Sequence, residues 1–302
     1  MIVKKSYICI CIITFKRTIL LEKLLESLIN QTISAPIDYC IVVVDNDKNE
    51  SAKLTVSRFQ AESSLPIYYF VEPEQNVSLA RNRALTSIRA DFLAGLDDDE
   101  FPGHSWLTNL YSTLIEYRAD GVLGPIKPYF MVEPPKWIIK GRFFEREEFP
   151  TGTILTSTKQ TRTGNFMLAN RIIAENEVLF RSEYGKIGGD DIDFFKRMLD
   201  KKYRFVWCNE ATVHENVPAV RFKRSSFLKR ALMRGIANAK WAPLLSYDTF
   251  KSITAITIYT TLLPFLLIYR HHIFMRYLIK DCDHLGKVLA RCGIRVLRER
   301  SD

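Results

Sequence analysis

The densest group of ionisable side chains in the sequence is the run Asp97-Asp98-Asp99-Glu100, which follows the apolar residues 93–96. Adjacent carboxylates repel one another, so at the end of a buried strand they indicate either a solvated turn or a cation site. Side chains alternate along an extended backbone, which places Asp97 and Asp99 on one side. This pair suits Mg²⁺ or Mn²⁺, which bind few protein carboxylates together with phosphate oxygens and water. An aspartate that caps the next helix is the alternative.

A second acidic group, Asp190, Asp191 and Asp193, follows Gly188 and Gly189 at the predicted start of a helix. The helix dipole favours carboxylates at this end, so capping alone accounts for them in one interpretation. In the other, one carboxylate is a general base that removes a proton from an attacking hydroxyl near a metal-bound diphosphate.

The elements that must position these acids form an alternating pattern. Strand, helix and buried strand follow one another, which predicts βαβ units and a parallel sheet. The predicted strands are 6–14, 39–44, 67–71, 91–96 and 203–208, and the predicted helices are 20–30, 78–88, 104–116 and 190–198. Thr14, Asp45 and the acidic run follow strand ends, where open parallel sheets bind ligands. No GxGxxG or GxxxxGK[ST] motif occurs, which disfavours a dinucleotide site and a P-loop.

The chain is basic overall, with 302 residues, a formal net charge of +9 and 47% hydrophobic residues, enough for a large core. Its residues 221–240 contain seven lysines and arginines and no acid. Such a charge attracts nucleic acid, anionic lipid or a nucleotide-linked substrate. The six cysteines show no ligand spacing, which favours a reducing, cytosolic environment.

Residues 252–269 contain no charged side chain and lie between basic segments. Eighteen residues are at the lower limit for spanning a bilayer, and four threonines and Pro264 weaken that interpretation. A helix in the membrane interface, held by neighbouring Lys and Arg, fits the pattern at least as well. Residues 125–163 lose all periodicity and are rich in proline and aromatic residues, which is typical of a functional loop.

Six segments in this order resemble the family 2 glycosyltransferases of GT-A fold. They are Ile-Thr-Phe-Lys-Arg (13–17), Val-Val-Val-Asp-Asn-Asp (42–47), Asn76 with Leu-Ala-Arg-Asn-Arg-Ala (79–84), Leu-Asp-Asp-Asp-Glu-Phe-Pro (96–102), Thr-Gly-Asn (163–165) and Gly-Gly-Asp-Asp (188–191). The resemblance covers about the first 215 residues. The insert around Pro134, Pro135 and Trp137 is similar to that of bacterial exopolysaccharide enzymes of the succinoglycan type.

The resemblance implies roles for particular residues. Thr14 and Asp45 match positions that line the base and ribose of a nucleotide sugar, usually a uridine nucleotide, and Arg81 matches the arginine that approaches the nucleotide. Asp97 and Asp99 match the metal-binding pair, with Asp99 as the direct ligand. The catalytic base is Asp191. The donor-binding set is completed by Arg17, Asp98, Gly164, Asn165 and Asp190.

Three positions leave alternatives open. Asp190 stands where the family more often has Glu, and its shorter side chain loses reach. His214 is a candidate metal ligand, with a hydrogen-bonded structural histidine as the alternative. Trp137 is a candidate for stacking on an acceptor sugar, and otherwise closes a loop onto the core.

Taken together, the sequence predicts an α/β GT-A protein with a Rossmann-like, mostly parallel sheet and a C-terminal helical membrane-associating segment. Residues 1–220 are the expected catalytic domain, with nucleotide-sugar binding in about 1–102 and the acceptor side in about 103–220. Residues 221–302 are the basic, helical C-terminal region with its apolar segment.

The predicted activity is that of an inverting hexosyltransferase that uses Mn²⁺ or Mg²⁺. It would move a sugar from a nucleotide-diphosphate donor, a UDP-sugar, to a lipid-linked or oligosaccharide acceptor in bacterial surface polysaccharide synthesis. Its expected location is the cytoplasmic face of the inner membrane, against anionic lipid, either peripherally or with one inserted helix. Two alternatives are a basic nucleic-acid-binding protein and a nucleotidyltransferase with a similar metal site. The nucleic-acid-binding protein is disfavoured because the basic run leads into the apolar segment. The nucleotidyltransferase is disfavoured because such enzymes normally have a glycine-rich phosphate loop after the first strand, and residues 14–18 contain no glycine.

Overall fold

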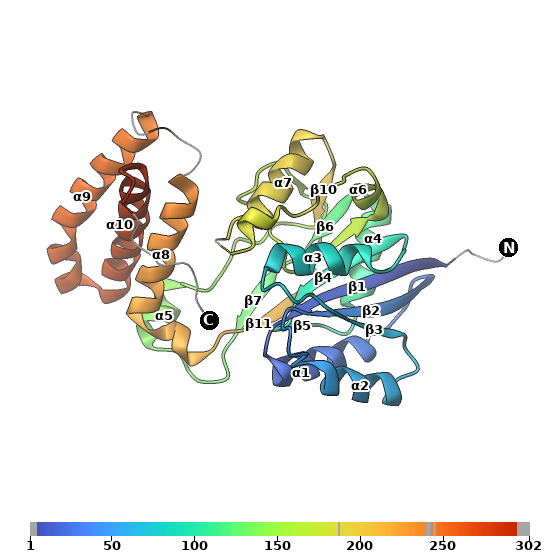
Figure 1. Ribbon diagram of the computed structural model, residues 1–302. Coiled ribbons are helices and arrows are strands. Elements are labelled where there is room, and N and C mark those ends of the chain that lie inside the picture. The colour runs from blue at the N-terminus through green and yellow to red at the C-terminus, as the bar shows by residue number, and fades with distance from the viewer. Residues whose placement is uncertain (1–4, 187, 240–242, 244–245, 295–302) are drawn as a thin grey trace. The chain divides into compact units, whose positions relative to one another are not determined.

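The computed structural model describes residues 5–186, 188–239, 243 and 246–294, and the chain forms two compact units (Figure 1). The first unit comprises residues 1–128 and 146–216, and the second comprises 129–145 and 217–302. The sequence-based boundary at residue 220 left 129–145 in the catalytic domain, whereas these residues pack in the second unit. Lys240 of the basic run and the last eight residues, 295–302, lie outside the described residues.

The first unit is built on an eight-stranded sheet of order β3-β2-β1-β4-β9-β6-β10-β8. The strands in chain order are β1 (Ser6–Thr14), β2 (Ile37–Asp45), β3 (Ile67–Val71), β4 (Phe92–Asp97), β6 (Gly121–Leu123), β8 (Ile154–Leu155), β9 (Phe166–Ala169) and β10 (Phe205–Trp207). β1, β2 and β4 are mainly buried and apolar because both of their faces are covered, whereas β3 lies at the edge of the sheet and only its Ile67 is buried. Each lies where the apolar pattern predicts a strand.

The register of the sheet brings the polar strand ends together. β1 is parallel to both β2 and β4, so that Thr14 pairs with Asp45 and Ile13 with Asp97. β9 runs antiparallel between β4 and β6 and so connects the first four strands to β6, β10 and β8. The expected mostly parallel GT-A sheet is confirmed, and the edge at which three polar segments meet follows directly from its register.

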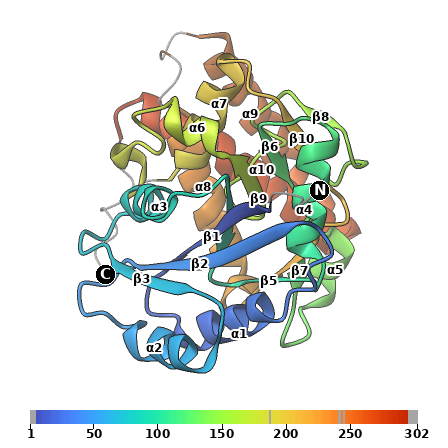
Figure 2. The ribbon, with the colours of Figure 1, turned by 90° about the vertical axis from the view of Figure 1, so that its right-hand side faces the viewer.

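Helices cover both faces of the sheet (Figure 2). On one face α1 (Thr18–Ile29), α2 (Lys53–Glu62) and α4 (Trp106–Glu116) pack against Ile8, Ile10 and Ile12 of β1. On the other, α3 (Val77–Thr86), α6 (Asn170–Ala174) and α7 (Asp190–Asp200) pack against Cys9 and Cys11. The alternation of side chains along β1 therefore separates two apolar cores. A short 3-10 helix, Ser182–Tyr184, precedes α7.

A smaller three-stranded sheet continues from the turn after β4. Its order is β5 (Glu100–Pro102), β11 (Val213–Asn216) and β7 (Ile126–Tyr129). The pairing of β5 with β11 sets Glu215 opposite Glu100 and His214 opposite Phe101. The backbone N–H of Asn216 also donates to the carbonyl oxygen of Asp99 (2.8 Å), which fixes the acidic turn from its far side.

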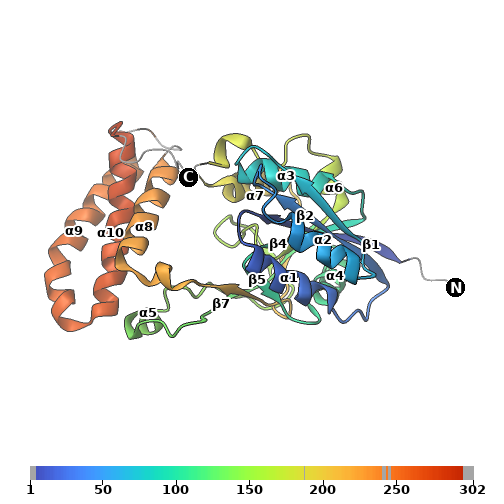
Figure 3. The same ribbon diagram turned by 60° about the horizontal axis from the view of Figure 1, so that its bottom comes forward.

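The second unit contains three long helices with a short helix beside them (Figure 3). They are α8 (Arg224–Ala239), α9 (Tyr247–Tyr269), α10 (His271–Arg291) and the short α5 (Lys136–Gly141), with a 3-10 turn at Ala219–Phe222. The unit is held by an aromatic cluster of Phe130, Trp137, Phe143, Phe144, Phe222 and Phe227. The aromatic segment predicted to be a long loop thus contains α5 and supplies the core of the second unit.

Candidate active site

The acidic turn between β4 and β5 is anchored through Asp98. The Thr14 hydroxyl at the end of β1 donates to Asp98 (2.9 Å), and the Arg17 guanidinium donates to Asp98 (2.8 Å) and to Asp99 (3.0 Å). Thr14 and Asp98 are both buried. Burial raises the pKa of Asp98, and the positive charge of Arg17 opposes that rise. Thr14, Arg17 and Asp98, three residues of the predicted donor-binding set, are therefore connected by hydrogen bonds.

Asp97 and Glu100 differ sharply in exposure. The Asp97 side chain is 39% exposed, whereas Glu100 is buried and accepts the Asp97 backbone N–H through its carboxylate (3.0 Å). Burial, followed by the charge of Asp97, raises the pKa of Glu100 well above its usual range. Asp97 is thus the carboxylate of this turn that solvent reaches most easily, and Glu100 holds its backbone from beneath.

The environment of Asp99 fits a divalent cation. Burial, followed by the negative charge of Asp97, raises the pKa of Asp99 to about 6, and the positive charge of Arg17 opposes this rise. Among the described residues no group of three or more His, Cys, Asp or Glu could hold a metal by itself. A cation here would take one or two carboxylates, Asp99 and Asp97, and complete its coordination with phosphate oxygens and water.

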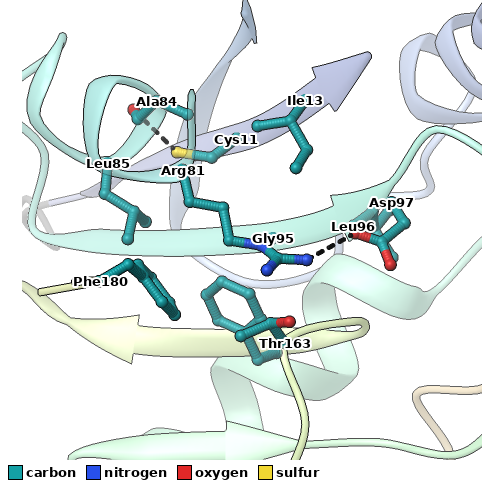
Figure 4. Close-up of a pocket in the computed structure, with 11 residues that line it drawn as sticks. Cys11, Ile13, Arg81, Ala84, Leu85, Gly95, Leu96, Asp97, Thr163 and Phe180 are labelled. Carbon is teal, nitrogen blue, oxygen red and sulfur yellow. Dashed lines mark hydrogen bonds and ion pairs between the residues drawn. The ribbon is translucent and has the colours of Figure 1, made fainter. Parts of the chain in front are cut away.

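Arg81 of α3 links the two acidic groups of the sequence. Its buried guanidinium donates to Asp190 and reaches Asp97 at 3.4 Å. The guanidinium also lies over the Phe180 ring, 5.7 Å from its centroid (Figure 4). A cavity of about 20 Å³ adjoins it, which has room for about one water molecule and none for a nucleotide. Arg81 therefore fixes the start of α7 against the end of β4.

The start of α7 depends on two glycines. Gly188 and Gly189 have φ of +85° and +94°, a backbone region that favours glycine. This turn sets Asp190 and Asp191 in the first turn of the helix, where Asp190 is buried against Arg81 and Asp191 is partly exposed. Burial and the charge of Asp190 raise the pKa of Asp191, a shift that suits a general base.

Arg162 is a site residue that the sequence did not single out. Burial, followed by the charge of Arg146, lowers its pKa, while Asp191, Glu100 and Glu215 act in the opposite direction. Its positive charge in turn lowers the pKa of Asp191. Its position immediately before Thr-Gly-Asn (163–165) could have identified it as a candidate. The neighbouring sequence does not indicate, however, that its charge acts on Asp191 of α7.

The Asp45 carboxylate is held by partners within the first unit, at the strand end where the sequence places it. The residue has no exposed surface, and its carboxylate accepts the N–H of Ala52 (2.7 Å), the N–H of Asp47 (3.0 Å) and the Tyr69 hydroxyl (2.9 Å). A carboxylate with these three partners holds the loop after β2 and is not open to a base or ribose. Its place at the strand end was predicted correctly, but its partners come from residues farther along the chain.

Gly164 and Asn165 are also structural rather than open to a ligand. Asn165 is fully buried, and its amide accepts from the Trp106 indole (2.7 Å) and donates to the carbonyls of Pro125 (2.9 Å) and Ala211 (2.7 Å). A Cβ atom on Gly164 would lie 2.3 Å from the Glu100 carboxylate. All polar atoms of the Asn165 side chain are used within the protein, and its expected place in a loop beside the donor sugar stays a prediction.

Two other candidates are His214, on the strand that pairs with the end of the acidic turn, and Trp137, in the second unit. The His214 side chain is exposed beside Phe101 and is part of no metal-binding group among the described residues. Trp137 belongs to the second unit, where its ring packs edge-on against Phe143 (5.2 Å) and Phe227 (5.4 Å). For Trp137 the alternative of an aromatic that closes a loop onto a core describes the observed packing.

Sequence comparison gives this geometry a family context. The family model described as glycosyl transferase family 2 matches residues 9–176. The succinoglycan biosynthesis protein ExoM of Rhizobium meliloti (strain 1021) is 32% identical over 232 residues, which make up 76% of the chain and 73% of that protein. Chondroitin synthase of Pasteurella multocida (strain Pm70) is 30% identical over 126 residues, 41% of the chain and 13% of that protein.

Solved structures show the same fold. TarS residues 1–349 of S. aureus in complex with UDP superpose with a TM-score of 0.54 and 14% identity, over 95% of the chain and 92% of that structure. The complex of the same TarS fragment with UDP-GlcNAc gives a TM-score of 0.54 over 98% of the chain and 95% of that structure. At 14% identity this likeness concerns the fold alone.

Proposed function

The chain belongs to glycosyl transferase family 2 and is a glycosyltransferase, and from this we propose that it transfers a sugar from a UDP-sugar to a lipid-linked saccharide with inversion at the anomeric carbon. The observation that carries the proposal is Arg81, which ties Asp190 at the start of α7 to Asp97 at the end of β4. That single side chain holds the start of α7, which carries the candidate base Asp191, against the strand end that carries the candidate diphosphate site.

In the proposed reaction Asp191 accepts the proton of an acceptor hydroxyl as the hydroxyl oxygen bonds to the anomeric carbon. The bond from that carbon to the diphosphate oxygen breaks, and its electron pair leaves with the diphosphate. Attack opposite to the leaving group inverts the configuration. The raised pKa of Asp191 makes it a stronger base than an ordinary surface carboxylate.

A bound Mn²⁺ or Mg²⁺ would neutralise the charge that develops on the diphosphate as the glycosidic bond breaks. Asp99 and the more exposed Asp97 are the residues that would hold it. Arg17 keeps Asp98 and Asp99 in position, and the half-buried Arg162 adds a positive charge that lowers the pKa of Asp191. A uridine donor is supported by two TarS structures whose ligands are UDP and UDP-GlcNAc. A role in bacterial polysaccharide synthesis is supported by the similarity to ExoM.

We also propose that α9 attaches the protein to the cytoplasmic membrane surface without crossing the bilayer. Within the described part of the chain, α9 is the one helix long and apolar enough to span. Its side against α10 is polar, however: Thr260 donates to Asp281 (3.2 Å), Ser252 lies 3.1 Å from His284, and Arg291 pairs with Asp248 (2.6 Å). Asp281, His284 and Arg291 belong to α10, so a spanning α9 would either lose these contacts or carry the α10 side chains into hydrocarbon, which costs several kcal/mol. An interfacial helix keeps them in water, and we expect alkaline carbonate to release the protein from membranes.

The donor and metal are tested together by hydrolysis of UDP- and GDP-sugars without an acceptor. We expect slow hydrolysis of a UDP-sugar with Mn²⁺, loss of hydrolysis in EDTA, and Mn²⁺ affinity at least about tenfold weaker in Asp99→Asn. Asp38→Asn, at an exposed aspartate paired with Lys5, is the matched control and should behave like the wild type. Hydrolysis that persists in EDTA would contradict metal dependence.

A further inference from the structure

The second unit contains an open cavity of about 700 Å³ with a basic and aromatic lining. It is formed by Lys136, Trp137 and Lys140 of α5 and by Arg270, His271 and His272, where α10 begins. None of these lining residues is acidic. Two segments that are distant in the sequence thus converge on one opening, and α5 lies beside the end of the bundle at which α10 begins (Figures 1 and 3).

No carboxylate of the described residues pairs with the lysines or the arginine at this cavity. Lys136, Lys140 and Arg270 are exposed, and among the described residues none of them pairs with a carboxylate. Three cations without counter-charges repel one another, and a bound anion would relieve that repulsion. The charge arrangement therefore points to an anionic ligand of more than one negative charge.

The floor of the cavity offers polar contacts in addition to charge. The Nε2 atom of His271 is buried and has no hydrogen-bond partner in the described part of the chain. His271 is held by the Trp137 ring, with centroids 5.7 Å apart. It is also the first residue of α10, a helix of 21 residues whose first turn has no side-chain cap. An oxyanion in the cavity could accept from the backbone N–H groups at the uncapped end of the helix.

We propose that this cavity binds the diphosphate of a lipid-linked acceptor. The proposal rests on the proposed function for the identity of the acceptor. Three permanent cations match a diphosphate better than the single charge of a phosphodiester headgroup. The apolar end of α9 immediately precedes Arg270 and exposes Phe265, Ile268 and Tyr269, which gives the lipid chain an apolar surface. Headgroup and chain are thus matched by neighbouring polar and apolar surfaces.

The experiment compares the full chain on three kinds of phosphatidylcholine vesicle. One kind carries a polyprenyl diphosphate, the second carries phosphatidylglycerol at the same total charge, and the third has no anionic lipid. The test variant combines Lys136→Gln, Lys140→Gln and Arg270→Gln. The matched control combines Lys223→Gln, Lys229→Gln and Lys251→Gln, which remove three exposed positive charges of the same unit outside the cavity.

We expect the wild type to prefer the diphosphate vesicles and inorganic diphosphate to compete for its binding. The test variant should bind them at least about tenfold more weakly, and the control should lose no more than about twofold. Equal losses in the two variants would overturn the proposal, because general attraction would then explain binding. Equal binding of the wild type to phosphatidylglycerol would also overturn it.

Hydrolysis of a UDP-sugar without acceptor keeps this inference separate from the proposed function. The test variant should retain the wild-type rate, since no substituted residue lies in the first unit. If the wild type itself hydrolyses no UDP-sugar, the proposed function is contradicted. The vesicle comparison then still tests whether the cavity binds a lipid diphosphate. The single variant Arg270→Gln changes one exposed residue and should show a smaller loss of binding to the diphosphate vesicles. It keeps the proposal testable if the triple variant misfolds.

Discussion

The indole N–H of Trp106 donates to the side-chain oxygen of Asn165 (2.7 Å), and both side chains are buried. This bond joins α4 to the segment before β9, and the amide nitrogen of Asn165 continues it to two backbone carbonyls. Asn165, a residue of the Thr-Gly-Asn segment, therefore connects α4 to the backbone at Pro125 and Ala211.

Replacement of Asn165 should affect stability rather than donor affinity. Asn165→Ala removes three hydrogen bonds and should lower the free energy of unfolding by about 3 kcal/mol. Asn165→Gly relieves the backbone at φ +51° but removes the same bonds, so it should remain clearly destabilised. Denaturant unfolding measures both. A variant that unfolds like the wild type but loses donor affinity would instead place Asn165 in contact with the donor.

Asp191 is predicted to act in chemistry and not in donor binding. Asp191→Asn should lower the rate of sugar transfer at least about 100-fold, because the amide cannot take the acceptor proton. The dissociation constant for UDP, measured by calorimetry, should change little. Asp200→Asn makes the same change at the exposed far end of α7 and should leave transfer intact. Undiminished transfer by Asp191→Asn would remove it from the mechanism.

Arg162 should set the pH at which transfer declines on the acid side. A base must be deprotonated to act, so the rate falls as the pH drops through the pKa of Asp191. The positive charge of Arg162 lowers that pKa. Arg162→Gln should therefore move the acid limb of the rate profile to higher pH, whereas Arg58→Gln, paired with Glu22 on the surface, should not move it. An unchanged limb would show that the two charges are not coupled.

The pair formed by Arg81 and Asp190 should behave as a unit. Arg81→Leu leaves a buried carboxylate without its main partner, which costs about 3–5 kcal/mol of stability. Adding Asp190→Asn removes the unpaired charge and should recover much of this loss. The two single variants and the double variant form a double-mutant cycle, for which the free energies of unfolding are measured. Additive losses would mean that the two side chains do not interact.

The sequence predicts those parts of the fold that one segment determines locally. β1 and β2 read as strands because each is a continuous apolar run, and the turn before α7 was predicted from two adjacent glycines. Shorter elements escaped prediction because distant partners make them: β8 has two residues and exists by pairing with β10. The acidic turn could be identified from its charges alone. The effect of Arg162 on Asp191 could be identified only from the folded structure, because no neighbouring residue in the chain indicates it.

The discontinuity of the second unit also imposes an order on biosynthesis. Residues 129–145 leave the ribosome before 146–216, yet Phe130, Trp137 and Phe144 find their partner Phe222 and its neighbours only after the whole first unit has been made. During that interval the aromatic side chains of 129–145 are exposed, which favours aggregation or binding by chaperones. A fragment that stops at residue 216 would keep this hazard permanently. A well-behaved isolated first unit should instead require excision of 129–145, with a short linker from Pro128 to Arg146.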